Sequence, residues 1–217
     1  MNQVIIYIGV LTEYQGIDLL IEAIPLVVRE APNVKFLIVG YPNEDYYLQK
    51  ARALGVEKWV HFTGKVQHEK LPQYLSLGDI AVSPKISTTE ANLKLFSYMA
   101  MGLPTVVFDN PVNREILGNL GIYAPSGDTE SLAQALVAIL QDGSRAHQLG
   151  AQGRAKATAD YSWLAVGKRL KHIYDAIEKS AVSNQDSGAK ETSYEQVSNS
   201  SDRRRRFHGL PFSKRTD

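Results

Sequence analysis

Polar side chains between residues 87 and 94 could hold an anion that also carries hydroxyl groups. These side chains belong to Ser87, Thr88, Thr89, Glu90, Asn92 and Lys94. The carboxylate of Glu90 can accept hydrogen bonds from two hydroxyl groups, and the ammonium of Lys94 can donate to a phosphate. Simpler explanations remain open, because a helix dipole favours a glutamate in the first turn and a lysine there can be fully solvated.

The elements that must position these residues form a strand–loop–helix–strand unit over residues 79–109. Residues 80–82 and 105–108 are short, continuously apolar runs, which is typical of parallel strands buried on both faces. A helix is expected over residues 90–101, followed by a Gly-Leu-Pro stop. In such a unit the unpaired N–H groups and the positive dipole end of the helix lie beside the first strand's carboxyl end, where both favour anions.

The same alternation of strand, loop and helix recurs along the chain. Further strands are expected at residues 4–8, 34–39, 59–62 and 121–124, and further helices at 17–30, 46–54, within 65–78, within 110–118, and at 128–140, 144–158 and 162–178. Pro25 is expected to kink or shorten the first helix. The pattern predicts an α/β fold, a Rossmann-like doubly wound parallel sheet with helices on both faces and a binding crevice at the strands' carboxyl ends.

Gly9 and Gly16 bracket the loop after the first strand. They either turn the chain or let the backbone approach a phosphate or sugar, and the residues alone leave both explanations open.

Composition excludes several classes of protein. A chain of 217 residues with 44% hydrophobic residues can form one domain plus an appendage. A formal net charge of +1 gives no bulk attraction for nucleic acid, so no specific nucleic-acid partner is expected. With no cysteine and no paired histidine spacing, neither a metal site nor another cofactor is expected, and a reducing cytoplasm fits. The apolar N-terminus is too short to span a bilayer, so the protein is expected to be cytoplasmic or peripheral at a membrane.

The central unit also resembles a known family. Its Pro84, Glu90, Lys94-Leu95, Tyr98-Met99-Ala100, Gly102 and Pro104 are similar to the donor-site segment of GT-B glycosyltransferases, most of all family 4. In that family this segment holds the sugar and ribose of a nucleotide-sugar donor through a pair of glutamates. The resemblance implies a donor-binding, hexosyltransferase-like domain with Glu90 as the candidate catalytic residue.

The same resemblance implies a wider donor site, whose candidate residues are Gly9, Gln15, Gly16, Gly64, Lys65, Val66, Thr89, Asn92, Leu93, Lys94 and Ser97. The backbone of residues 64–66 matches the family segment that reads the base. The sequence departs from the family at three places. Val10 and Gln15 stand where the family has two cations for the diphosphate, and Ser97 stands where it has the second glutamate. Lys94 could replace the lost cations.

The resemblance covers residues 4–178, which corresponds to the C-terminal half of a GT-B enzyme. One hypothesis is a glycosyltransferase donor domain that acts with a separate acceptor-domain subunit or N-terminal half. The other is a non-catalytic nucleotide- or partner-binding module derived from such a domain, as the three departures suggest.

The expected domain covers residues 1–179, and residues 180–217 read as a disordered polar tail. This segment is rich in serine, asparagine, glutamine and charge and poor in aliphatic residues. It carries a basic cluster, Arg203, Arg204, Arg205 and Arg206, for which solvation or weak contact with an anionic membrane is expected.

Overall fold

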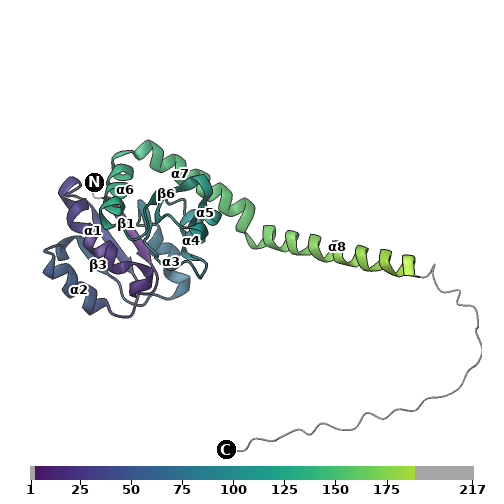
Figure 1. Ribbon diagram of the computed structural model, residues 1–217. Coiled ribbons are helices and arrows are strands. Elements are labelled where there is room, and N and C mark those ends of the chain that lie inside the picture. Colours follow the sequence, from purple (N-terminus) through teal and green to yellow (C-terminus); the bar gives the residue numbers. More distant parts are fainter. Residues whose placement is uncertain (1–2, 189–217) are drawn as a thin grey trace, which may run out of the picture. The chain divides into compact units, whose positions relative to one another are not determined.

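The computed structural model describes the backbone of residues 3–188, and in this part of the chain six strands form one sheet. The strands are β1 (Val4–Ile8), β2 (Lys35–Val39), β3 (Val60–Phe62), β4 (Ile80–Ser83), β5 (Thr105–Phe108) and β6 (Gly121–Ala124). Their order is β3-β2-β1-β4-β5-β6, and every neighbouring pair is parallel (Figure 1). The predicted doubly wound parallel sheet is therefore confirmed.

The helices follow the predicted alternation. They are α1 (Ile17–Glu30), α2 (Glu44–Ala53), α3 (Leu71–Leu75), α4 (Lys94–Ala100), α5 (Pro111–Leu117), α6 (Thr129–Gln141), α7 (Gly143–Lys156) and α8 (Trp163–Gly188). A π-helical turn, Ala157–Tyr161, follows α7. The side chain of Asp128 caps α6 by accepting from the Ser131 N–H at 3.0 Å, as its position before the apolar stripe predicts.

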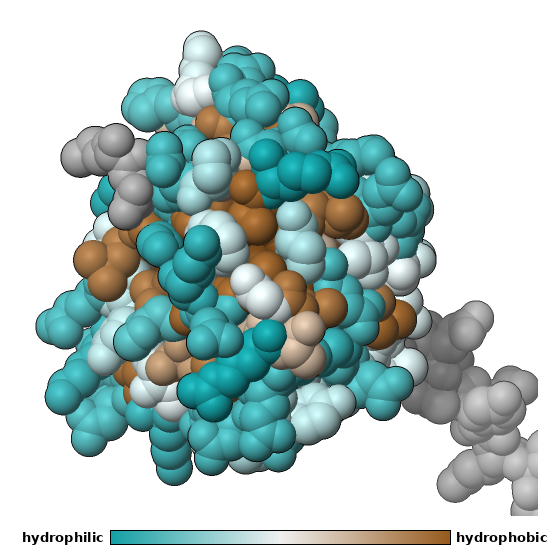
Figure 2. Space-filling model, turned by 90° about the vertical axis from the view of Figure 1, so that its left-hand side faces the viewer, coloured by the Kyte–Doolittle hydropathy of each residue, from teal (hydrophilic) through white to brown (hydrophobic). Residues whose placement is uncertain are grey.

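Both faces of the sheet are covered, because successive side chains of a strand point to opposite sides. Ile5 and Tyr7 of β1 join the core formed with α1, α2 and α6, whereas Ile6 and Ile8 join the core formed with α3, α4 and α5. The apolar stripe of α1 is buried through Val28, so packing carries the helix past Pro25 to Glu30 and the helix does not end early there. On the side of α1 and α2, Figure 2 shows a mostly hydrophilic surface with hydrophobic residues visible between polar ones.

The chain order reverses between β1 and β4, which are neighbours at the centre of the sheet. Their pairing ends at Ile6 and Ala81. Beyond that point the Tyr98 hydroxyl bridges the strands: it accepts from the Ile8 N–H at 2.9 Å and donates to the Val82 carbonyl at 3.2 Å. The two strands thus separate toward their carboxyl ends while their backbone groups stay paired, and a crevice can open there.

A first compact unit ends at Leu170, earlier than the expected domain boundary at residue 179. Helix α8 continues to Gly188, so residues 180–188 of the expected tail are helical and the predicted helix end at residue 178 was too early. The rest of that tail, including the arginines at 203–206, lies outside the described residues. Within the described range, no helix is both long and apolar enough to cross a membrane.

Candidate functional site

A cavity of about 440 Å³ lies at the carboxyl ends of β1 and β2, beside α4. Its lining is Ile8, Gly9, Val10, Gln15, Val39, Gly40, Tyr41, Val66, His68, Leu71, Lys85, Glu90, Ala91, Asn92, Leu93, Lys94 and Ser97. The cavity therefore occupies the crevice that the strand order predicts.

The structure brings most of the predicted site residues together. Those that line the cavity are Gly9, Gln15, Val66, Glu90, Asn92, Leu93, Lys94 and Ser97. Gly16, Gly64, Lys65 and Thr89 are not among its lining residues. Two lining residues, Lys85 and Tyr41, were missed. Lys85 follows Pro84 just after β4, and Tyr41 follows Gly40 just after β2. Their positions were a usable signal, because residues at that edge of a parallel sheet face the crevice.

Lys94 points its ammonium toward the loop after β1. Its Nζ donates to Gln15 Oε1 at 2.7 Å and lies 3.4 Å from the Tyr7 hydroxyl and 4.4 Å from the centroid of that ring. Gly9 leaves room for it, since a Cβ there would sit 3.0 Å from Nζ. Burial, and then the nearby charge of Lys85, lower the pKa of Lys94 to about 7.

Lys85 holds the loop that carries Glu90. Its side chain is only 3% exposed, and its Nζ donates to the Glu90 carbonyl at 3.0 Å and to the Ala91 carbonyl at 3.5 Å. The Glu90 carboxylate lies 3.4 Å from the same Nζ and is 64% exposed. Glu90 thus keeps acceptor capacity for a ligand in the cavity.

Asn92 lines the cavity, and its side chain is held by hydrogen bonds within the protein. Its amide donates to Ser83 Oγ at 3.0 Å and to Asn113 Oδ1 at 2.9 Å, and Asn113 donates to the Phe108 carbonyl at 2.7 Å. All three side chains of this network are buried. The donors of Asn92 are used within the protein, so it positions the loop rather than donating to a ligand.

Helix α4 begins at Lys94, not at residue 90 as expected. The N–H groups of Leu95 and Phe96 donate to the carbonyls of Asn92 and Leu93, at 3.0 and 3.2 Å. The helix start therefore does not offer those groups to an anion, and the Lys94 side chain is left as the main source of positive charge from this helix.

The loop after β1 is fastened to the loop after β4. Gly16 has φ +72°, and a Cβ there would lie 1.8 Å from the Pro84 carbonyl oxygen. The Tyr14 carbonyl accepts from the Ile86 N–H at 3.1 Å. Gly16 is thus required for the contact of the two loops, and its direct role in binding the donor stays a prediction.

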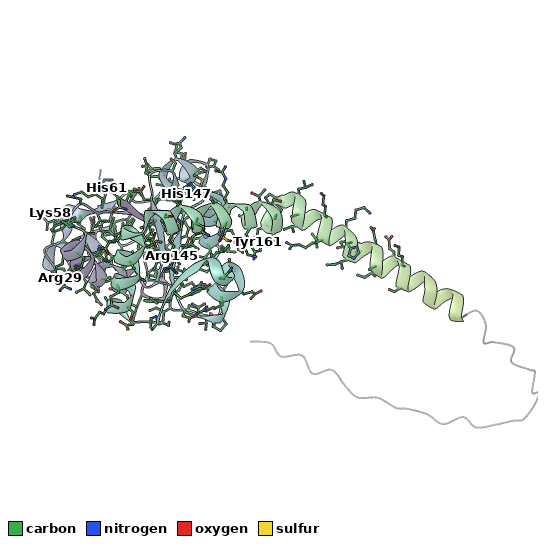
Figure 3. The ribbon with its side chains drawn as sticks, turned by 90° about the horizontal axis from the view of Figure 1, so that it is seen from above. Arg29, Lys58, His61, Arg145, His147 and Tyr161 are labelled. Carbon is green, nitrogen blue, oxygen red and sulfur yellow. The ribbon has the colours of Figure 1, made fainter. Side chains whose placement is uncertain are left out.

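The described histidines show no metal-binding arrangement. His61 comes from β3 and His147 from α7, and both are labelled in Figure 3. Among the described residues no three or more histidine, cysteine, aspartate or glutamate side chains gather where they could hold a metal ion.

The family model described as "Glycosyl transferases group 1" matches residues 2–142. Relatives include a phosphatidyl-myo-inositol mannosyltransferase of Mycobacterium leprae, 28% identical over 183 residues, and an alpha-D-kanosaminyltransferase of Streptomyces kanamyceticus, 30% identical over 177 residues. These matches cover 83% and 80% of this chain, and 48% and 46% of those proteins, respectively. The chain thus spans about half the length of these relatives.

Solved structures show the same fold at low identity. Sucrose-phosphate synthase from Thermosynechococcus elongatus matches with a TM-score of 0.72 and 22% identity, over 82% of this chain and 46% of that one. HepE of Anabaena, in complex with UDP and glucose, matches with a TM-score of 0.70 and 18% identity, over 81% and 48%. Since the family model covers more than half of the sequence, this chain belongs to the group 1 glycosyltransferases, and its sheet is the Rossmann-like fold found in GT-B enzymes.

Proposed function

We propose that this chain is the donor-binding domain of a family 4 glycosyltransferase and that its cavity binds a nucleotide diphosphate sugar. The observation that carries the proposal is Lys94, whose ammonium faces the crevice of a GT-B-type sheet and forms no ion pair with any acidic side chain that the structure describes. A diphosphate supplies the missing negative charge. A solved structure of this fold, HepE, is described in complex with UDP-glucose, which supports the same class of ligand here.

The lining suggests how the donor would lie. Lys94, Gln15 and Gly9 form the polar wall that suits the diphosphate. The exposed carboxylate of Glu90 suits sugar hydroxyl groups, because a carboxylate accepts hydrogen bonds from two of them. Val39, Tyr41 and Val66 form a more apolar end for the base. Sugar transfer would further require an acceptor domain, as a separate subunit or an N-terminal half, and we expect that assembly in the cytoplasm or at a membrane surface.

A second candidate is a binding module without transferase activity. It is favoured by Ser97, which lines the cavity at the position where the family has its second glutamate. A panel of UDP-, GDP- and ADP-sugars in a thermal-shift assay tests both candidates for donor binding. At about 100 times its dissociation constant, a ligand stabilises the folded state by about 2.7 kcal/mol.

Two substitutions separate the proposed roles. Lys94→Ala should weaken a nucleoside diphosphate and the matching nucleotide sugar alike, by about 1.5–3 kcal/mol for a charge-assisted hydrogen bond. Glu90→Ala should weaken only the nucleotide sugar. Calorimetry with both ligands measures the difference, and Lys58→Ala is the control, because this exposed lysine does not line the cavity. Equal effects of Glu90→Ala on both ligands would remove its assigned role.

A further inference from the structure

The ammonium of Lys94 has neutral partners only. Its hydrogen-bond acceptors are the amide oxygen of Gln15 and the hydroxyl of Tyr7, and the ring of Tyr7 provides a cation–π contact. Among the side chains that the structure describes, no carboxylate forms an ion pair with Lys94. A lysine that is removed from water without a counter-charge favours its neutral form.

The ionisable groups around Lys94 add no negative charge to it. Tyr7 on β1 and Tyr98 on α4 are buried, and burial raises the pKa of both phenols, so both are neutral. Lys85 brings a second positive charge. The carboxylate of Glu90 lies 3.4 Å from Lys85 Nζ, and His68, which also lines the cavity, can only add positive charge.

We propose that Lys94 takes up a proton from solvent when the diphosphate of a nucleotide sugar enters the cavity, and that the new ammonium pairs with the phosphate oxygens. The inference rests on the proposed function and deepens it. No covalent bond forms or breaks, and buffer supplies the proton. The diphosphate of a nucleotide sugar is doubly esterified and stays dianionic near neutral pH, so the proton is not exchanged with the ligand.

Proton uptake makes donor binding depend on pH in a defined direction. In the empty cavity the pKa of Lys94 is about 7, and an anion bound beside the amine raises it. Below about pH 7 the lysine is already charged, so its ionisation leaves the affinity unchanged. Above that pH the affinity should fall, approaching about tenfold per pH unit until the pKa of the complex is reached.

Calorimetry in paired buffers tests this directly on the complete chain. UDP-glucose and GDP-mannose are titrated at about pH 8 and about pH 6 in two buffers whose ionisation enthalpies differ, such as Tris and HEPES. The dependence of the binding heat on the buffer counts the protons exchanged. The expected result is uptake of close to one proton per ligand at the higher pH, falling strongly at the lower pH.

Lys94→Arg is the matched variant, because a guanidinium stays charged and should bind donor without proton uptake. Lys58→Arg is the control, because Lys58 is exposed and does not line the cavity, and it should leave proton uptake unchanged. If the donor binds at about pH 8 with a heat that does not depend on the buffer, the inference is overturned and the proposed function stands. Proton uptake that persists in Lys94→Arg would have the same meaning. If no member of the panel of UDP-, GDP- and ADP-sugars binds, both the inference and the proposed function fall.

A measurement on the unaltered protein does not depend on how arginine packs. The 13Cε signal of Lys94 should titrate near pH 7 in the free protein. In the complex its midpoint should move up by at least one pH unit. A midpoint in the free protein above about pH 9, as for an ordinary lysine, would overturn the inference.

Discussion

At the residue scale, the substitution Lys94→Met is expected to stabilise the empty protein at acidic pH. The pKa of Lys94 is about 7 in the folded chain, below the ordinary value of 10.5. Below pH 7 both folded and unfolded states are protonated, so the cost of burying the charge is fully present. As pH rises from 7 toward 10.5 the unfolded state binds more protons and this cost disappears. The free energy of unfolding of Lys94→Met should therefore exceed that of the unaltered protein by about 1 kcal/mol near pH 6, and this difference should shrink by pH 9.

Urea unfolding at the two pH values measures the effect, and Lys50→Met is its control. Burial lowers the pKa of Lys50, but hydrogen bonds from its Nζ to Asp18 and Glu22, both at 2.7 Å, raise it on balance. Removal of Lys50 should therefore destabilise the protein where Lys94→Met stabilises it. A loss of stability for Lys94→Met at both pH values would show that its ammonium has a stabilising partner.

At the element scale, Gly16→Ala should separate the two loops that form one wall of the site. Alanine at φ +72° is strained, and its Cβ would meet the Pro84 carbonyl oxygen. Gly55→Ala is the matched control, because Gly55 has φ +70° and nothing within 4 Å of a Cβ. Gly55→Ala should lower the free energy of unfolding by about 1 kcal/mol, and Gly16→Ala should lower it by about 1–3 kcal/mol more. Urea unfolding of both variants compares them, and equal losses would mean that the loop contact adjusts without cost.

Local sequence predicted most elements because their signals are local. The bounds of β1, α1, β5 and β6 agree with the structure, since each has a continuous apolar run or stripe with a glycine or proline at its border. The predicted start of α4 was wrong because it depends on Asn92, whose buried amide joins Ser83 at the end of β4 and Asn113 on α5, contacts that only the folded chain brings together. Lys85 was missed for the same reason: its contacts with the Glu90 and Ala91 carbonyls exist only once the loop has closed.

The site was predicted in outline because sheet topology fixes its place. Once strands at residues 4–8 and 80–83 are parallel neighbours at a reversal of strand order, the loops that follow them must meet. That argument brought Gly9, Gln15 and Lys94 together correctly. It could not reveal which side chains form internal hydrogen bonds, as the buried amide of Asn92 does with Ser83 and Asn113.

At the scale of the whole molecule, we expect that this chain alone binds a donor and transfers no sugar to an acceptor. Glycosyl transfer requires donor and acceptor to be held in near-attack geometry with water excluded. The cavity that the structure describes is lined on the donor side by one sheet and its loops, and the chain spans about half the length of relatives such as the mannosyltransferase of Mycobacterium leprae.

The measurement follows sugar release from UDP-glucose and GDP-mannose with and without added acceptor alcohols, while thermal shift confirms that the donor is bound. Binding should persist and turnover should be absent. Addition of an acceptor domain that assembles with this chain should restore transfer, and Glu90→Ala should then lower the rate more than Lys58→Ala does. Rapid transfer by the isolated chain would refute the requirement for a second domain, because one sheet and its loops would then be sufficient to position the acceptor.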